Sequence, residues 1–190
     1  DDLVNCGTGE IVTNNGASSI SAWIYPTGGG GGNLGRIFAR TGDATGTGYN
    51  FIIDNVNVVN GISFFMDGSS PVKAISAANA ITLNQWQHVL ATWDGSGTAV
   101  NIHIYVNGVE VSYSSQANGA TPETLASHSS FIGNRENLNR SFGGSITEVA
   151  VWNAVLSAAN IATLYGGGNP PKGAPKNIAT ANLKGYRSEE

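Results

Sequence analysis

The stretch SFGGSITEVAVWNAVLSAANIATLYGGGNP (residues 141–170) decides the fold of this chain, because it begins as a strand and ends as a helix. Residues 146–153 alternate between two faces, as successive side chains of a β-strand do. One face carries Ile146, Glu148, Ala150 and Trp152, and the other carries Thr147, Val149, Val151 and Asn153. Both faces hold apolar residues, which indicates a strand that is at least partly covered on both sides.

The second half of the stretch predicts a short helix. Ser157 is a good N-cap for a helix over residues 158–165, in which Ile161, Leu164 and Tyr165 share one face. Three glycines (residues 166–168) end the helix. A helix of about two turns is not stable alone in water, so we expect it to lie against a larger structure.

The rest of the chain reads as short strands separated by turns rich in Gly, Asn and Asp. The sequence predicts strands near residues 19–26, 35–40, 49–54, 61–67, 72–76, 85–95, 100–113 and 129–134. Asn107-Gly108, between alternating apolar runs, is a strong hairpin signal. This pattern is typical of a β-sandwich or jelly roll. The five glycines of residues 28–32 lack the Lys-Ser/Thr of a phosphate loop and predict a flexible surface turn.

Composition excludes several classes of protein. The 190 residues suit one domain, or one domain with a tail, and the net charge of −4 comes without a basic stripe. Nucleic acid is therefore not an expected partner. No apolar run approaches the ~20 residues of a membrane helix, so we expect no membrane insertion. Cys6 is the only cysteine, which excludes an intrachain disulfide, and we interpret it as a small buried residue. The chain does not start with Met and has no signal peptide, which indicates a mature product or an excised piece.

Five segments occur in the order found in laminin-G-like and pentraxin-like domains of the concanavalin A-like lectin/glucanase superfamily. They are SISAWIYP (19–26), NQWQHVLATWDGS (84–96), IYVNGVEV (104–111), SSFIGN (129–134) and SFGGSITEVAVWNAVLSAANIATLY (141–165). The resemblance covers residues 4–168 and implies an all-β fold, a two-sheet antiparallel β-sandwich (jelly roll) with one short C-terminal helix at the sandwich edge. It predicts a domain over residues 1–168 and a tail over 169–190, whose residues 182–186 return as an edge strand near residues 1–7.

Catalysis is not indicated by the sequence. Glycosidases hold two carboxylates roughly 5–10 Å apart, yet the interior acids of this chain are all at least eleven residues apart in sequence. The strand with three alternating acids that the glucanase branch carries is missing. His88 and His103 lie in predicted strands without metal-ligand spacing, and we interpret them as sheet residues. We therefore expect no enzyme.

Exposed aromatic rings are the usual platforms for sugars, because the C–H faces of a pyranose stack on them. Trp23, Trp86, Trp93 and Trp152 all lie in alternating segments, which favours a place in the core. Tyr49 and Phe142 lie next to loops and are the better candidates for ligand binding, together with Asn139 in the loop NRENLN (134–139).

Calcium is the cofactor that the resemblance implies. Ca²⁺ takes six to eight oxygen ligands, and loop Asp, Glu and Asn side chains supply them. The pentraxin-like calcium loops correspond to Asp43 and to Glu136 and Asn137, which we take as the candidate metal ligands. Arg135 stands about where such loops place an acid.

Three functions remain open. The first is a non-catalytic, lectin-like module that binds glycan or polysaccharide in adhesion. The second is a structural or decoration module of a phage virion or bacterial surface protein, with capsid, tail or surface proteins as partners. The third is a glycan-cleaving enzyme. The first two place the chain outside the cell or on a particle surface.

Overall fold

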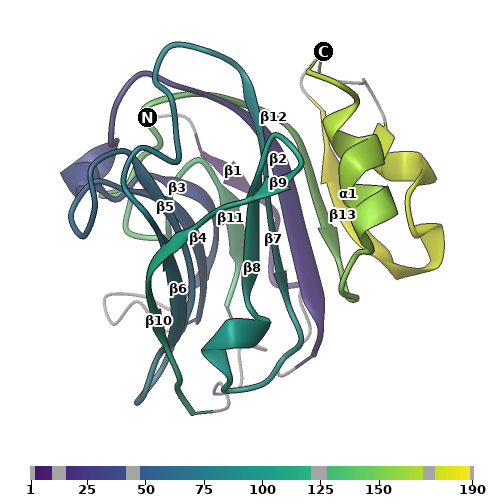
Figure 1. Cartoon of the computed structure of the whole chain (residues 1–190), viewed down its shortest axis with the longest axis horizontal. Coiled ribbons are helices and arrows are strands. Elements are labelled where there is room, and N and C mark those ends of the chain that lie inside the picture. Colours follow the sequence, from purple (N-terminus) through teal and green to yellow (C-terminus); the bar gives the residue numbers. More distant parts are fainter. Residues whose placement is uncertain (1–2, 10–15, 42–47, 121–127, 169–173, 189–190) are drawn as a thin grey trace.

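The computed structural model describes residues 3–9, 16–41, 48–120, 128–168 and 174–188 (Figure 1). Within these ranges, two antiparallel sheets face each other as the two layers of a sandwich, which confirms the predicted fold class. The seven-stranded sheet runs in the order β1 (Val4–Asn5), β11 (Ser130–Ile132), β3 (Arg36–Thr41), β4 (Gly48–Asp54), β5 (Gly61–Asp67), β6 (Val72–Ser76) and β10 (Tyr113–Ala117). The six-stranded sheet runs β13 (Leu183–Arg187), β12 (Gly144–Trp152), β2 (Ser18–Pro26), β7 (Gln87–Trp93), β8 (His103–Val106) and β9 (Val109–Glu110).

The main core fills the space between the sheets. Both layers contribute alternate residues to it, including Ile20, Ala22 and Ile24 of β2 and Tyr49, Phe51 and Ile53 of β4. The intervening residues of each strand consequently face away from the core, because side chains alternate along a strand. In the seven-stranded sheet, β3 and β4 are buried along their whole length, whereas Phe65 and Asp67 of β5 are partly exposed.

The predicted alternation of residues 146–153 is wrong at one position. The pairing of β12 with β2 shifts register between Thr147 and Ala150, and Glu148 has a φ of 52° there. This β-bulge adds one residue to β12, so Val149 packs in the main core while Ala150 lies on the outer face. The simple pattern predicted that Ile146 and Ala150 share a face, but they lie on opposite faces of the sheet.

The predicted helix is confirmed as α1 (Ala158–Tyr165), which lies beside the six-stranded sheet in Figure 1. Ser157 caps it, since its side chain accepts a hydrogen bond from the backbone N of Asn160 at 3.3 Å. Ile161 and Leu164 pack on the outer face of the sheet in a second apolar cluster with Trp152. None of the helices in the described ranges is long and apolar enough to cross a membrane.

The C-terminal segment returns as the edge strand β13, one residue later than predicted. It pairs with β12, whereas β1 pairs with β11 in the other sheet. The two ends of the described chain therefore do not pair with each other. Glu148 ties this segment down, because its carboxylate accepts hydrogen bonds from Tyr186 Oη at 2.7 Å and from Ser188 Oγ at 2.8 Å.

A tight hairpin turn and four 3-10 helices connect strands in the described ranges. Asn107 and Gly108 have φ values of 52° and 76° and join β8 to β9, which confirms the predicted hairpin. The 3-10 helices are η1 (Gly31–Asn33), η2 (Ala99–Asn101), η3 (Ala174–Asn177) and η4 (Thr180–Asn182).

Candidate functional site

The glycine run of residues 28–32 packs closely against the loop that joins β11 to β12. Gly31 N donates a hydrogen bond to Ser141 O at 2.8 Å, and Thr27 N donates one to Gly143 O at 2.7 Å. A Cβ on Gly30 would lie 2.3 Å from Ser141 O, and Gly30 has a φ of 69°. The run is therefore a fitted backbone contact that holds the loop, and not simply the flexible surface turn that the sequence suggested.

The loop of residues 134–140 contains three of the predicted site residues. The buried amide of Asn134 organises it by accepting hydrogen bonds from the backbone N of Arg135 at 2.9 Å and of Arg140 at 3.0 Å. Arg135 Nε donates to Asn137 Oδ1 at 2.9 Å and to Asn139 Oδ1 at 2.8 Å. The side-chain oxygens of Asn137 and Asn139 thus converge on a guanidinium, while Glu136 is exposed.

This arrangement does not fit calcium as it stands. With Asn137 bonded to Arg135, a divalent cation at that oxygen would lie beside a fixed positive charge and be repelled. Among the described residues, no three His, Cys, Asp or Glu side chains are grouped so that they could hold a metal ion. Asp43 lies outside the described residues, so the calcium site with Asp43, Glu136 and Asn137 stays a prediction.

The structure places Tyr49 in the core. Its side chain is 0% exposed, and its ring packs edge-on against Trp93, with the ring centres 5.6 Å apart. Tyr49 therefore offers no surface to a sugar, contrary to the prediction. Phe142 is partly buried and packs against the main core, which leaves only part of its ring for a ligand. Asn139 is exposed in the loop of residues 134–140.

The outer face of the seven-stranded sheet lies next to this loop. Because Ile62, Phe64 and Met66 of β5 point into the core, Ser63, Phe65 and Asp67 point outward. Arg36 pairs with Ile52 across β3 and β4, and it starts β3 beside the loop, where its backbone N donates a hydrogen bond to Arg140 O at 3.0 Å. The side chain of Arg36 thus enters the outer face at its loop end.

Arg36 reaches across β4 to the aromatic ring of Phe65 on β5. Its guanidinium carbon lies 5.8 Å from the centre of the Phe65 ring. The Arg36 side chain is only 3% exposed, whereas Phe65 is partly exposed. One face of the sheet therefore presents part of an apolar ring that lies beside a buried guanidinium.

Charged groups surround this pair. Burial lowers the pKa of Arg36 to about 10, and repulsion from Arg135 and Arg140 adds to the effect, while Asp67 and Asp54 oppose it. Burial also raises the pKa of Asp67, against the opposing effect of Arg36, Lys73 and Arg135. We call Arg36, Phe65, Asp67, Lys73 and Arg135 the sheet-face site. It combines an acceptor, several donors and an aromatic surface within one patch.

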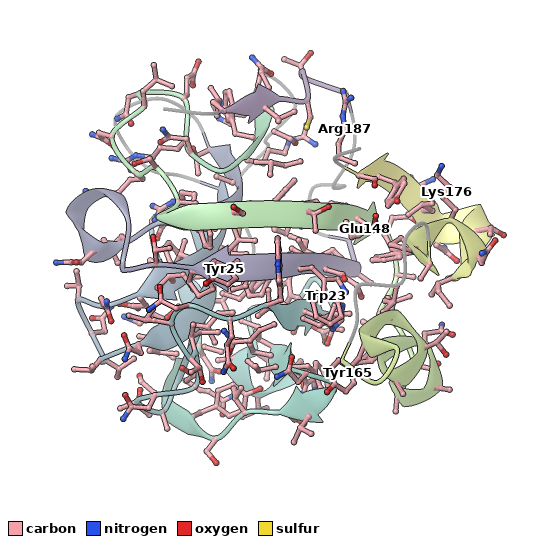
Figure 2. All side chains as sticks on the ribbon, turned by 90° about the horizontal axis from the view of Figure 1, so that it is seen from above. Trp23, Tyr25, Glu148, Tyr165, Lys176 and Arg187 are labelled. Carbon is pink, nitrogen blue, oxygen red and sulfur yellow. The ribbon has the colours of Figure 1, made fainter. Side chains whose placement is uncertain are left out.

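The outer face of the six-stranded sheet carries a different set of aromatic rings (Figure 2). Trp23 is 2% exposed because Tyr165 of α1 stacks on it, with the ring centres 6.2 Å apart and the planes 20° apart. Trp86 is 41% exposed and packs edge-on against Tyr25 at 5.8 Å, so the prediction that all four tryptophans are core residues is wrong for Trp86. The Trp86–Tyr25 pair is a second exposed aromatic surface.

Most of the described carboxylates have structural partners. Asp54 accepts hydrogen bonds from Asn57 Nδ2 at 2.8 Å and from Ser63 Oγ at 2.7 Å, and Asp94 accepts them from Ser96 Oγ and Asn101 Nδ2, both at 2.7 Å. Glu110 bonds His103 and Tyr113, and Glu148 holds the C-terminal strand. These carboxylates order turns and strands. Of the two that remain, Glu136 lies exposed in the loop and Asp67 lies in the sheet-face site.

A further hollow opens at the edge of the sandwich, where β11 and β3 approach β12 and β13. It encloses about 260 Å³ and is lined mainly by apolar side chains, with Arg187 at its polar side. Cys6 lines it and packs partly against the main core, and burial raises the pKa of its thiol. Cys6 is thus half-buried, which agrees only in part with the buried position that we expected.

Comparison with known proteins places the fold in a family. The family model described as the concanavalin A-like lectin/glucanases superfamily matches residues 1–162, so this chain belongs to that family of β-sandwich domains. The search of curated proteins gave no match.

Three solved structures illustrate the likeness in fold. A proposed carbohydrate-binding protein from Bacteroides ovatus matches 99% of this chain and 49% of its own, with a TM-score of 0.65 and 18% identity. The CBM40 domain of a Ruminococcus gnavus sialidase, solved with α2,3-sialyllactose, matches 79% of this chain and 82% of its own, with a TM-score of 0.60 and 17% identity. Tailspike protein 2 of bacteriophage CBA120 matches 98% of this chain and 28% of its own, with a TM-score of 0.63 and 14% identity. The chain spans about half the length of the first of these structures.

Proposed function

We propose that this domain is a non-catalytic, lectin-like module that binds glycans through the sheet-face site. The observation that carries the proposal is the Phe65 ring, partly exposed with Arg36 fixed over it at 5.8 Å and Asp67 in the same patch. A sugar presents an apolar C–H face and a rim of hydroxyl groups that both donate and accept hydrogen bonds. An aromatic ring beside a guanidinium and a carboxylate complements both parts.

The carboxylates support a role without catalysis. A glycosidase needs a second acid at a set distance from the first. The carboxylates of Asp54 and Glu148 already accept hydrogen bonds from Ser63 and Tyr186, which stabilise the fold. Asp67 is the one acid that we assign to the sheet-face site. Binding, in contrast, needs no such pair.

The likeness in fold to carbohydrate-binding structures agrees with this proposal. The proteins from Bacteroides ovatus and Ruminococcus gnavus are described as carbohydrate-binding, and the second was solved with a sialylated trisaccharide. We infer from this likeness that the domain works in adhesion outside the cell or on a particle surface.

The proposal extends to further glycan contacts from the loop and to calcium. Asn139 and Phe142 would contact the part of a glycan that overhangs the loop, and Asp43, Glu136 and Asn137 would hold Ca²⁺ only if Arg135 moved away. A ligand that binds only the folded state raises its melting temperature. An unchanged melting temperature on adding Ca²⁺ to EDTA-treated protein would remove the support for the metal.

A structural module of a phage virion or bacterial surface protein is the second candidate. It is favoured by the match of 98% of this chain to a phage tailspike protein. In that case the exposed Trp86–Tyr25 pair would face a capsid, tail or surface protein instead of a sugar.

The experiment is a glycan array probed with the full chain, once with calcium and once with EDTA. Binding in both arms supports the glycan-binding proposal without a metal, and binding only with calcium adds the metal. Absence of binding in both arms would overturn the proposal and favour the structural module.

A further inference from the structure

The sheet-face site holds more positive than negative charge, although the chain as a whole carries −4. Arg135 and Arg140 both lie near enough to Arg36 that their positive charge lowers its pKa. In the described ranges, the one ion pair closer than 4 Å joins His103 to Glu110. The three arginines therefore repel one another without a carboxylate in direct contact.

Two of these arginines also have donors without a partner. Arg36 Nη1 donates to Leu34 O at 2.9 Å, but Arg36 Nε is buried without a hydrogen-bond partner, and so is Arg140 Nε. A buried donor without a partner costs about 1–3 kcal/mol. The Arg36 side chain is only 3% exposed, so it is held in place at some cost to the stability of the fold.

The loop fixes the direction of the second guanidinium. Asn137 and Asn139 both accept from Arg135 Nε, on one edge of the group. The terminal nitrogens of Arg135 remain for a ligand, because a guanidinium offers five donors in a planar fork that matches a carboxylate or a sulfate. Asn137, which we first considered as a metal ligand, and Asn139, which we considered for ligand binding, therefore position a cation.

We propose that Arg135, with Arg36 and Arg140 adding positive charge nearby, binds the acidic group of a glycan, a carboxylate or a sulfate, while Phe65 carries the apolar face of the same sugar. This inference rests on the proposed glycan-binding function and names the class of ligand. An anion at this place supplies the negative charge that the arginines lack, and Lys73 at the outer edge of the site adds a further attraction. Asp67 would contact sugar hydroxyls, away from the acidic group.

The test uses matched pairs of glycans on the array, each pair identical except that one member has a carboxylate or sulfate and the other has a neutral group. We expect binding of at least one acidic member to be about tenfold or more tighter than that of its neutral partner, because a charge-assisted hydrogen bond is roughly twice as strong as a neutral one. The carboxylate and sulfate pairs show which acidic group the site takes.

Variants tie the effect to the site. Arg135→Gln is expected to weaken binding of the acidic member about tenfold while changing binding of the neutral member less than about twofold. Arg135→Lys should restore part of the affinity, since it restores the charge without the fork. Lys184→Gln removes one exposed positive charge from β13 in the other sheet and serves as the control for net charge.

Each outcome decides the inference. A preference for acidic members that Arg135→Gln removes and Lys184→Gln retains supports it. Binding of neutral members at equal strength, or a preference that Arg135→Gln leaves intact, overturns the inference and keeps the proposed function. Absence of binding to every glycan overturns both.

Discussion

The guanidinium carbon of Arg36 lies 5.8 Å from the centre of the Phe65 ring, although the two residues belong to strands that are not neighbours. β4 separates β3 from β5, and the long side chain of Arg36 crosses it on the outer face of the sheet. The sheet-face site is therefore assembled from three strands and one loop. Its geometry depends on strand register as much as on residue type.

Replacement of Phe65 by Ala tests the aromatic part of the site. We expect the affinity for a bound glycan to fall about three- to tenfold, because ring contacts contribute about 0.5–1.5 kcal/mol beyond their buried area. Isothermal titration calorimetry with a glycan found on the array measures the change. Trp86→Ala, on the other sheet, is the matched control. If Trp86→Ala lowers the glycan affinity more than Phe65→Ala does, the binding site lies on the six-stranded sheet and the proposed site is contradicted.

The glycine run should be needed for the loop that carries Arg135. In Gly30→Ala the new methyl group would meet Ser141 O at 2.3 Å in a backbone conformation with φ of 69°. We expect a loss of about 1–3 kcal/mol in the free energy of unfolding together with weaker glycan binding. Gly28→Ala has no atom within 4 Å of its added Cβ and should behave as the parent. Equal denaturation midpoints for the two variants would contradict the fitted contact.

Tyr49 should act on stability and not on binding. Tyr49→Ala removes a fully buried ring from between Phe64 and Trp93, and such deletions cost about 3–5 kcal/mol. Urea denaturation measures this loss, and Trp86→Ala, at a ring that is 41% exposed, should cost much less. A Tyr49→Ala protein of unchanged stability with weakened glycan binding would revive the ligand-binding prediction for this residue.

His88 should make the folded state sensitive to mild acid. Burial lowers the pKa of His88 to about 3, so the folded protein keeps it neutral while the unfolded chain takes up a proton below about pH 6.5. The unfolded state then binds more protons, and stability falls as pH drops from 7 to 5, by about 2 kcal/mol from this residue.

Denaturation at pH 7 and pH 5 measures this effect, with His88→Gln as the test and His103→Gln as the control. The loss of stability between the two pH values should shrink in His88→Gln and persist in His103→Gln, whose side chain lies exposed against Glu110. An unchanged loss in His88→Gln would assign the acid sensitivity to other groups.

The sequence predicts the parts of the fold that depend on neighbouring residues. Ser157 and Gly166 mark the ends of α1, and Asn107-Gly108 marks a hairpin, because caps and turns are specified by local backbone chemistry. The bulge at Glu148 escaped prediction, since an extra residue shows only when a strand is paired with its partner. The residues of β12 that follow the bulge lie on the opposite faces from those that simple alternation from Ile146 predicts.

The site was harder to predict than the fold. Tyr49 and Trp86 exchanged the roles that we expected, because proximity to a loop does not decide which face of a sheet a ring lies on. Arg36 and Phe65 were not singled out at all, since neither belongs to a motif and they meet only across β4. The signal that was available lay in Arg135, a cation in a loop otherwise rich in oxygen ligands.

The most direct test of the central claim is chemical-shift mapping on ¹⁵N-labelled protein, titrated with the tightest-binding glycan from the array. The account predicts shifts that cluster on the outer face of the seven-stranded sheet, at Arg36, Phe65 and Lys73, and in the loop around Arg135. Shifts confined to Tyr25 and Trp86 on the opposite sheet would contradict it.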